Sequence, residues 1–183
     1  MERNHFSVIA FSLILVLLIQ GQSIYQYSVK SIHGPNRPLH AYSGRKMLFI
    51  TLPVNRSPSA DSLLRSIDSL GDAYEGVVKI IAVPSIEDGF TVAQRPQLRQ
   101  WYRDFLDSSI LITDGMRTRK SSGSQQHPLF KWLTKVEKNQ HFNEDVNGPR
   151  MKFLVRASGE LYAVFRARTK LSSQTLHMAL QAP

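Results

Sequence analysis

Cysteine is absent from all 183 residues of the sequence. This absence excludes a disulfide framework, a thiolate metal site and redox sensing by a thiol. The six histidines, at positions 5, 33, 40, 127, 141 and 177, lack the paired spacing of a metal-binding motif. Neither a glycine-rich phosphate loop nor a G-x-S-x-G nucleophile motif occurs. We therefore expect neither a metal site nor a cofactor.

Acidic residues are also few, with 14 Asp and Glu against 23 Lys and Arg, so the formal net charge is +9. Such an excess of positive charge suits a partner such as an anionic ligand or an envelope protein, and it equally suits a solvated, soluble surface. The basic residues are scattered and form no nucleic-acid-binding signature, so no nucleic acid is expected. With 42% hydrophobic residues, the composition is that of a globular protein.

Long hydrophobic runs are limited to one, the 14 mostly apolar residues 6–19. This run is short for a membrane-spanning helix, which needs about 20 apolar residues. Basic residues precede it, and Gly21 and Ser23 are small residues suited to signal-peptidase cleavage. We expect residues 1–23 to be a signal peptide or an uncleaved N-terminal anchor, and residues 24–183 to form one domain. Both alternatives predict export, to the periplasm or the medium, with membrane attachment only if residues 6–19 are retained.

One stretch organises the rest of the chain. Met47–Leu52 is a continuous apolar run, typical of a strand that is covered on both faces in a parallel sheet. Ser57 and Pro58 then suit the N-cap and first position of a helix over residues 59–74. The face of this helix expected to pack on the sheet carries Leu63, Leu64, Ile67 and Leu70. In α/β sheets, such a helix N-terminus is a common place for ligands and reacting groups.

Strands and helices alternate along the remaining chain. Further strands are predicted at 77–83, 109–113, 151–155 and 161–165, with helices at 94–106, from 127 onward and at 172–181. Residues 24–42 are expected to form a β-hairpin, residues 157–160 the turn of a second hairpin, and residues 114–126 and 138–149 polar loops. The order predicts an α/β, thioredoxin-like fold with strands 47–52, 77–83 and 151–155 as central neighbours.

Several segments resemble one protein family. Residues 23–34, Ile80-Ile-Ala-Val-Pro84, His127-Pro-Leu-Phe-Lys-Trp-Leu133 and Lys152-Phe-Leu-Val155 with Gly159 are similar to segments of the glutathione peroxidases. The matches run in order over nearly the whole domain. The resemblance implies the thioredoxin-like sheet of that family, with flanking helices and an N-terminal hairpin.

The active site of the family does not carry over to this sequence. By this resemblance, the position of its peroxidatic cysteine or selenocysteine falls on Arg56, give or take one residue. The position of its glutamine holds Glu87, and those of its tryptophan and asparagine hold Gly148 and Pro149. Arginine stays protonated and is no nucleophile, whereas peroxide reduction at this position needs sulfur or selenium. The resemblance therefore implies a degenerate member without thiol peroxidase activity and without catalytic residues.

Three local features leave alternatives open. Arg56 either holds an anion, pairs with Glu87 or Asp88, or points into water as a surface arginine. The two adjacent carboxylates suggest acid–base work or a metal, or are simply solvated. A basic cluster on the following polar loop, Arg117, Arg119 and Lys120, either meets an anionic partner or is solvated.

The leading hypothesis is an exported, glutathione-peroxidase-like domain that binds or scaffolds in the envelope. The alternative is an enzyme that uses Arg56, Glu87 and Asp88 for another reaction in the same cleft. A third hypothesis is a relic without selected activity.

Overall fold

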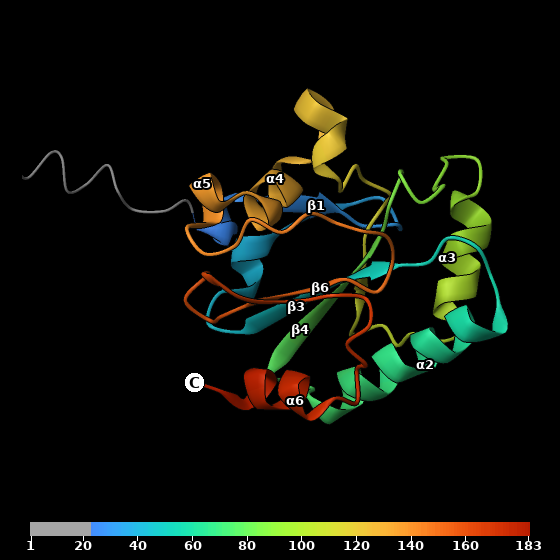
Figure 1. The fold of residues 1–183 in the computed structure, drawn as a ribbon. Helices are drawn as coiled ribbons and strands as arrows, with labels where there is room; N and C mark the ends of the chain where they lie inside the picture. Colours follow the sequence, from blue (N-terminus) through green and yellow to red (C-terminus); the bar gives the residue numbers. More distant parts are fainter. Residues whose placement is uncertain (1–22) are drawn as a thin grey trace, which may run out of the picture.

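A central sheet of five strands organises the computed structural model, which describes residues 23–183 (Figure 1). The strand order is β5-β4-β3-β6-β7. The bounds are β3 Lys46–Leu52, β4 Val78–Pro84, β5 Leu111–Ile112, β6 Lys152–Val155 and β7 Leu161–Phe165. β4 pairs in parallel with β3 and β5, whereas β6 pairs antiparallel to β3 and to β7.

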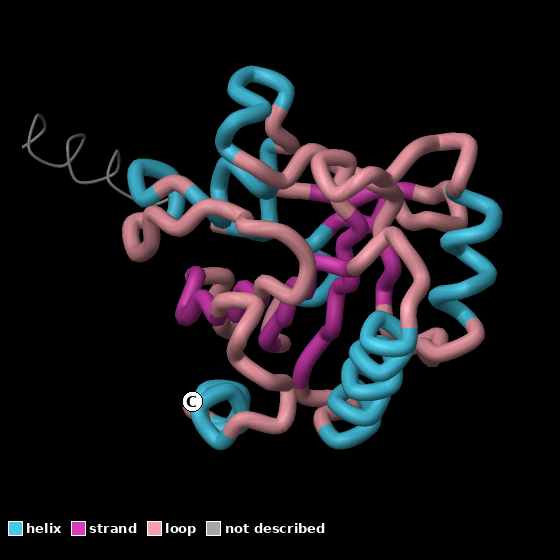
Figure 2. Tube along the Cα trace, turned by 45° about the vertical axis from the view of Figure 1, so that its right-hand side comes forward, coloured by secondary structure: helices cyan, strands magenta, loops and turns pink. Residues whose placement is uncertain are grey.

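Helices cover both faces of the sheet, so the molecule has three layers (Figures 1 and 2). The α-helices are α2 Pro58–Ala73, α3 Arg95–Arg103, α4 Pro128–Thr134, α5 Val136–Asn139 and α6 Gln174–Gln181. Short 3-10 helices are η1 Ile24–Gln26, η2 Leu39–Tyr42 and η3 Lys120–Gln125. The N-terminal hairpin pairs β1 Ser28–Lys30 with β2 Asn36–Pro38. No helix within residues 23–183 is long and apolar enough to span a membrane.

The central strands are buried on both sides because each separates two apolar clusters. In β3, Leu48 and Ile50 pack into the cluster under α2, α3 and α6, while Met47 and Phe49 pack into the cluster under α4 and η1. Successive side chains of a strand point to opposite faces, so an uninterrupted apolar run fills both clusters. The predicted burial of this run is confirmed, with Met47, Leu48, Ile50 and Leu52 each 0% exposed.

The turn and helix after β3 form as predicted. The Ser57 side chain accepts a hydrogen bond from the Ala60 N–H at 3.2 Å, and Pro58 occupies the first turn of α2. Leu64, Ile67 and Leu70 are buried under the helix, and Leu63 packs partly against them. The predicted α/β, thioredoxin-like order, the central strand neighbours and the antiparallel final hairpin are confirmed.

Several predicted bounds are wrong, mostly where polar loops are involved. Ile24–Gln26 is a 3-10 helix rather than the start of a strand, because the Ser23 side chain caps it. The predicted loop 114–126 contains η3, and the predicted loop 138–149 begins inside α5. Helix 94–106 ends at Arg103, and strand 109–113 is reduced to Leu111–Ile112. Short, polar elements such as these have little hydrophobic periodicity to reveal them.

Candidate functional site

Three loops meet at the carboxyl edge of the two central parallel strands. Leu52 at the end of β3 lies opposite Pro84 at the end of β4, so the chain segments toward Arg56 and Glu87 leave the sheet side by side. The turn before β6 joins them through Thr51, whose hydroxyl donates to the Gly148 carbonyl at 3.0 Å and accepts from the Met151 N–H at 2.9 Å. The fold therefore gathers the predicted positions at one edge.

Arg56 turns toward its own helix. Its Nε lies 3.4 Å from both carboxylate oxygens of Asp61, in the first turn of α2, and its guanidinium lies over the Phe105 ring. The side chain is 58% exposed. The predicted pairing of Arg56 with Glu87 or Asp88 is wrong, because an acid one turn along the helix is nearer. Asp61 also suits the positive end of the helix dipole and so offsets the charge of Arg56 there.

Asp61 is held from a second side as well. Its Oδ1 accepts a hydrogen bond from the Trp101 indole N–H at 2.7 Å. Arg65 lies one turn further along α2. Its guanidinium also lies over the Phe105 ring, with the guanidinium carbon 4.8 Å from the ring centroid. Arg56 is thus one part of a small surface cluster that joins α2 to the end of α3.

Glu87 is enclosed by hydrogen-bond donors. Its carboxylate accepts from the Ser85 hydroxyl at 2.7 Å, from the Thr118 N–H at 3.0 Å and from the Ser122 hydroxyl. Burial by itself raises the pKa of Glu87, but the hydrogen bonds from Ser122, the Thr118 backbone and Ser85 outweigh it and lower the pKa to about 2. The alternative in which Glu87 is simply solvated is wrong.

Asp88 forms an ion pair with Arg119 on the same neighbouring loop. Burial raises the pKa of Asp88, and the Arg119 guanidinium opposes that rise. The basic cluster is therefore not a free solvated set. Arg119 neutralises Asp88, and Lys120 donates to the Asn143 side-chain oxygen at 2.6 Å. Both adjacent carboxylates bind loop 114–126 to the end of β4.

The turn that holds Gly148 and Pro149 has its own backbone requirement. Gly148 has a φ of 96°, a conformation that L side chains rarely adopt, although no atom lies within 4 Å of where its Cβ would be. Arg150 also lies in the left-handed region, with its N–H donating to the Thr51 carbonyl at 2.7 Å. The backbone at position 148 thus favours glycine over a tryptophan for conformational rather than packing reasons.

Comparisons with known proteins bear on this arrangement. No protein-family model matches the chain. The glutathione peroxidase homolog BsaA of Bacillus subtilis (strain 168) is 26% identical over 150 residues, which make up 80% of this chain and 90% of BsaA. The solved structure of Trgpx in apo form has a TM-score of 0.63 at 16% identity, covering 88% of this chain and 97% of that one.

The chain has a glutathione-peroxidase-like thioredoxin fold. A thioredoxin-like protein from Aeropyrum pernix, with a TM-score of 0.58 at 14% identity, covers 98% of this chain and 100% of its own. At such identities the solved structures show a shared fold. The predicted resemblance to a degenerate glutathione peroxidase without cysteine is confirmed, while the matching of single positions to the family's catalytic residues stays a prediction.

Glu87 is poorly suited to acid–base catalysis near neutral pH. A general base works best with a pKa near the working pH, and the pKa of Glu87 is about 2. Among residues 23–183, no group of three or more His, Asp or Glu side chains is placed to hold a metal ion. Arg56, Glu87 and Asp88 each have a protein partner of their own.

Sequence reasoning missed the residues that bind these charged groups. Thr118 and Ser122 lie in a segment predicted only as a polar loop, and nothing local marks them as partners of a carboxylate more than 30 positions earlier. Asp61 was within reach of prediction. An acid in the first turn of a helix is a known signal, and it lies five positions after Arg56.

Proposed function

We propose that this protein is an exported, non-catalytic binding or scaffolding domain of the envelope that descends from thiol peroxidases. One observation carries the proposal. The turn that would present a peroxidatic residue presents Arg56 instead, paired with Asp61, in a chain that contains no cysteine. With no sulfur nucleophile, peroxide has nothing to oxidise at this position.

The alternative enzyme would need Arg56, Glu87 and Asp88 to act together on a substrate. Their contacts do not favour it, because Arg56 faces Asp61 while the two carboxylates face the loop that contains Thr118 and Arg119. No reaction is therefore assigned to this edge.

The proposed export rests on residues 6–19 and on Ser23, and intact-mass analysis of protein from its native host tests it. A full-length soluble species in the cytoplasm would contradict export.

Loss of peroxidase chemistry is tested by adding the sulfur back. Wild-type protein should consume neither hydrogen peroxide nor a lipid hydroperoxide with glutathione or thioredoxin as donor. Arg56→Cys places a thiol at a helix N-terminus, where the dipole favours the thiolate, yet we expect little turnover from this change alone. Arg56→Cys with Glu87→Gln should be more active than either single variant, because a neutral amide removes a nearby negative charge.

Any added cysteine reacts slowly with peroxide, and the matched control for this background is Ser121→Cys, at an exposed position of η3. Ser121→Cys should show no saturable turnover. Saturable peroxide reduction by the wild-type protein would overturn the proposed loss of activity. A double variant no better than Ser121→Cys would show that position 56 is not the position of the lost nucleophile.

A further inference from the structure

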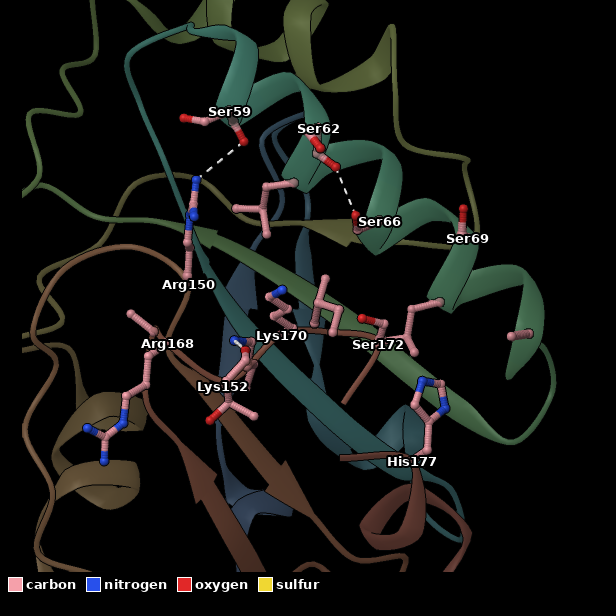
Figure 3. Close-up of a pocket in the computed structure, with 16 residues that line it drawn as sticks. Ser59, Ser62, Ser66, Ser69, Arg150, Lys152, Arg168, Lys170, Ser172 and His177 are labelled. Carbon is pink, nitrogen blue, oxygen red and sulfur yellow. Dashed lines mark hydrogen bonds between the residues drawn. The ribbon is translucent and has the colours of Figure 1, made fainter. Parts of the chain in front are cut away.

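A groove of about 630 Å³ lies along α2, and no residue of the cluster around Arg56 lines it (Figure 3). One wall is α2 itself, and the other is residues 167–172, which connect β7 to α6, together with Arg150 and Lys152. The α2 wall carries four serines at helical spacing, Ser59, Ser62, Ser66 and Ser69. The first and last are ten positions apart, which is about 15 Å of helix.

The second wall is strongly basic. Its positively charged residues are Arg150, Lys152, Arg168 and Lys170, and His177 lines the groove as well. None of the described residues that line the groove is acidic. Of the three acids of α2, Asp61 contacts Trp101 and Asp68 accepts the Asp107 N–H at 2.7 Å. The third, Asp72, is exposed and does not line the groove. The groove therefore has a field of one sign.

Lys152 is the unusual member of this set. It belongs to a central strand and is 1% exposed, yet its ammonium group donates to a neutral partner, the Thr169 carbonyl. No salt bridge joins it to a carboxylate within residues 23–183. Burial, and then the charge of Arg150, lower the pKa of Lys152 to about 8. A buried cation without a counter-ion is costly, and a bound anion would supply the missing charge.

Several donors that line the groove have no partner in the described part of the chain. The side chains of Arg168 and Lys170 are exposed and make no hydrogen bond there, and the same holds for the hydroxyls of Ser62 and Ser69. Figure 3 shows Lys152 and Lys170 near the middle of the groove, with Arg150 between them and Ser59. Ammonium, guanidinium and hydroxyl groups are the donors that phosphate oxygens accept from.

We propose that this groove binds a phosphate-bearing small molecule, with the phosphate held by Lys152, Arg150, Lys170 and the serine face of α2. The proposal rests on the proposed function as a binding domain and names its ligand class. A phosphate matches the site better than a carboxylate, because it carries more charge and offers more acceptor oxygens to this set of donors. The carbon skeleton of the ligand has apolar surface beside it, from Leu63, Leu70 and Leu171.

The test measures binding to the purified full chain at neutral pH by calorimetry, with inorganic phosphate and glycerol 3-phosphate as probes. Both should bind saturably, and acetate should bind far more weakly. Lys152→Met should weaken phosphate binding by roughly tenfold or more, since a charge-assisted hydrogen bond in a buried position is lost. Lys138→Met, an exposed lysine of α5 outside the groove, should bind as wild type.

Lys170→Ala keeps the test valid if Lys152→Met does not fold, because Lys170 is exposed and holds no other part of the structure. This variant should also weaken binding, by a smaller factor. Phosphate binding that is unchanged in folded Lys152→Met and in Lys170→Ala would overturn the proposal. So would acetate binding as tightly as phosphate.

A second arm separates a free phosphate ester from a lipid headgroup. Co-sedimentation with phosphatidylcholine vesicles, with and without phosphatidic acid, is compared between wild type and Lys170→Ala. Binding that depends on phosphatidic acid and falls in the variant identifies the headgroup as the source. If neither the phosphate probes nor the phosphatidic acid vesicles bind, the proposed phosphate site is wrong, and the proposed loss of peroxidase activity is unaffected. Peroxidase activity in the wild type would overturn the proposed function and leave phosphate binding intact.

Discussion

The strand-end edge and the groove along α2 differ in how their charged side chains are paired. At the strand-end edge, every charged group discussed has a partner within the protein: Arg56 has Asp61, Asp88 has Arg119, and Glu87 has four donors from nearby side chains and backbone. In the groove, Lys152 is buried with only a carbonyl, and Arg168 and Lys170 face outward. Paired charges stabilise the fold and leave little to attract a ligand, whereas unpaired charges weaken the fold and leave binding capacity.

This contrast explains why the strand-end edge need not be the functional surface of a glutathione-peroxidase-like fold. Buried polar groups that satisfy one another form a closed network with a single arrangement. The loop containing Thr118 and Ser122 is bound to Glu87 in this way. In the groove the donors meet only neutral carbonyls: Lys152 donates to Thr169, Arg150 to Ser59 at 3.3 Å and the Ser66 hydroxyl to Ser62 at 2.9 Å. The side chains of Arg168 and Lys170 have no such partner among the described residues, so their charges remain available to a ligand.

Removing a charge from each region sharpens the comparison, and the largest loss of stability is expected at the edge. Glu87→Ala leaves the donors of Ser85, Thr118 and Ser122 without their acceptor, and we expect a loss of roughly 2–3 kcal/mol in the free energy of unfolding at neutral pH. Because the folded pKa of Glu87 is about 2, below its ordinary value of 4.5, the carboxylate contributes fully above pH 4.5. The difference from wild type should narrow as pH falls from 4.5 through 2.

Urea unfolding at several pH values measures this difference. Glu137→Ala, an exposed acid of α5, is the matched control and should change stability by less than about 0.5 kcal/mol. If Glu87→Ala costs no more than Glu137→Ala, the hydrogen bonds around Glu87 do not stabilise the fold and the comparison fails.

In the groove, removing a charge should raise the free energy of unfolding rather than lower it. Lys152→Met replaces a buried, uncompensated cation with an apolar chain of similar length, and we expect a gain of roughly 1–3 kcal/mol at neutral pH. The folded pKa of Lys152 is about 8, below its ordinary 10.5, so the charge destabilises the folded state fully below pH 8. That penalty is released between pH 8 and 10.5, and the advantage of the variant should shrink over this window.

The Lys152 ammonium donates to the Thr169 carbonyl, and Arg150 is the cation whose charge lowers its pKa. Arg168, Lys170 and His177 line the same groove. Thermal unfolding with pH as the variable tests the expectation, with Lys138→Met as the exposed control. A Lys152→Met variant that is less stable than wild type at pH 7 would mean that its hydrogen bond to Thr169 outweighs the cost of burying the charge.

Arg56 should show the smallest effect. Its ion pair with Asp61 is exposed, and such pairs contribute about 0–1 kcal/mol and weaken with salt. Arg56→Ala should therefore lower the free energy of unfolding by less than about 1 kcal/mol, and less still in 1 M salt. Asp61→Ala is the informative comparison and should cost more, because Trp101 also loses its acceptor. A larger loss from Arg56→Ala than from Asp61→Ala would show that Arg56 has a further role in the fold.

The course of the chain was open to prediction because it follows local periodicity. An uninterrupted apolar run implied that β3 is buried on both faces, and Ser57 with Pro58 marked the start of α2. The absence of thiol chemistry is likewise a property of composition, since no folding can supply a cysteine that the chain lacks. Short polar elements such as η3 escaped prediction because they carry no such pattern.

Apart from Asp61 beside Arg56, the partners of the charged side chains were decided by the tertiary structure alone. Glu87 meets Ser122 across 35 positions and Lys152 meets the Thr169 carbonyl across 17, and neither separation corresponds to a helix or strand repeat. The groove depends on α2 and residues 167–172, about 100 positions apart, packing with a gap between them. Sequence periodicity determines which side chains turn inward. Which charge then faces which partner depends on loops whose directions are set only once the sheet and its helices have packed.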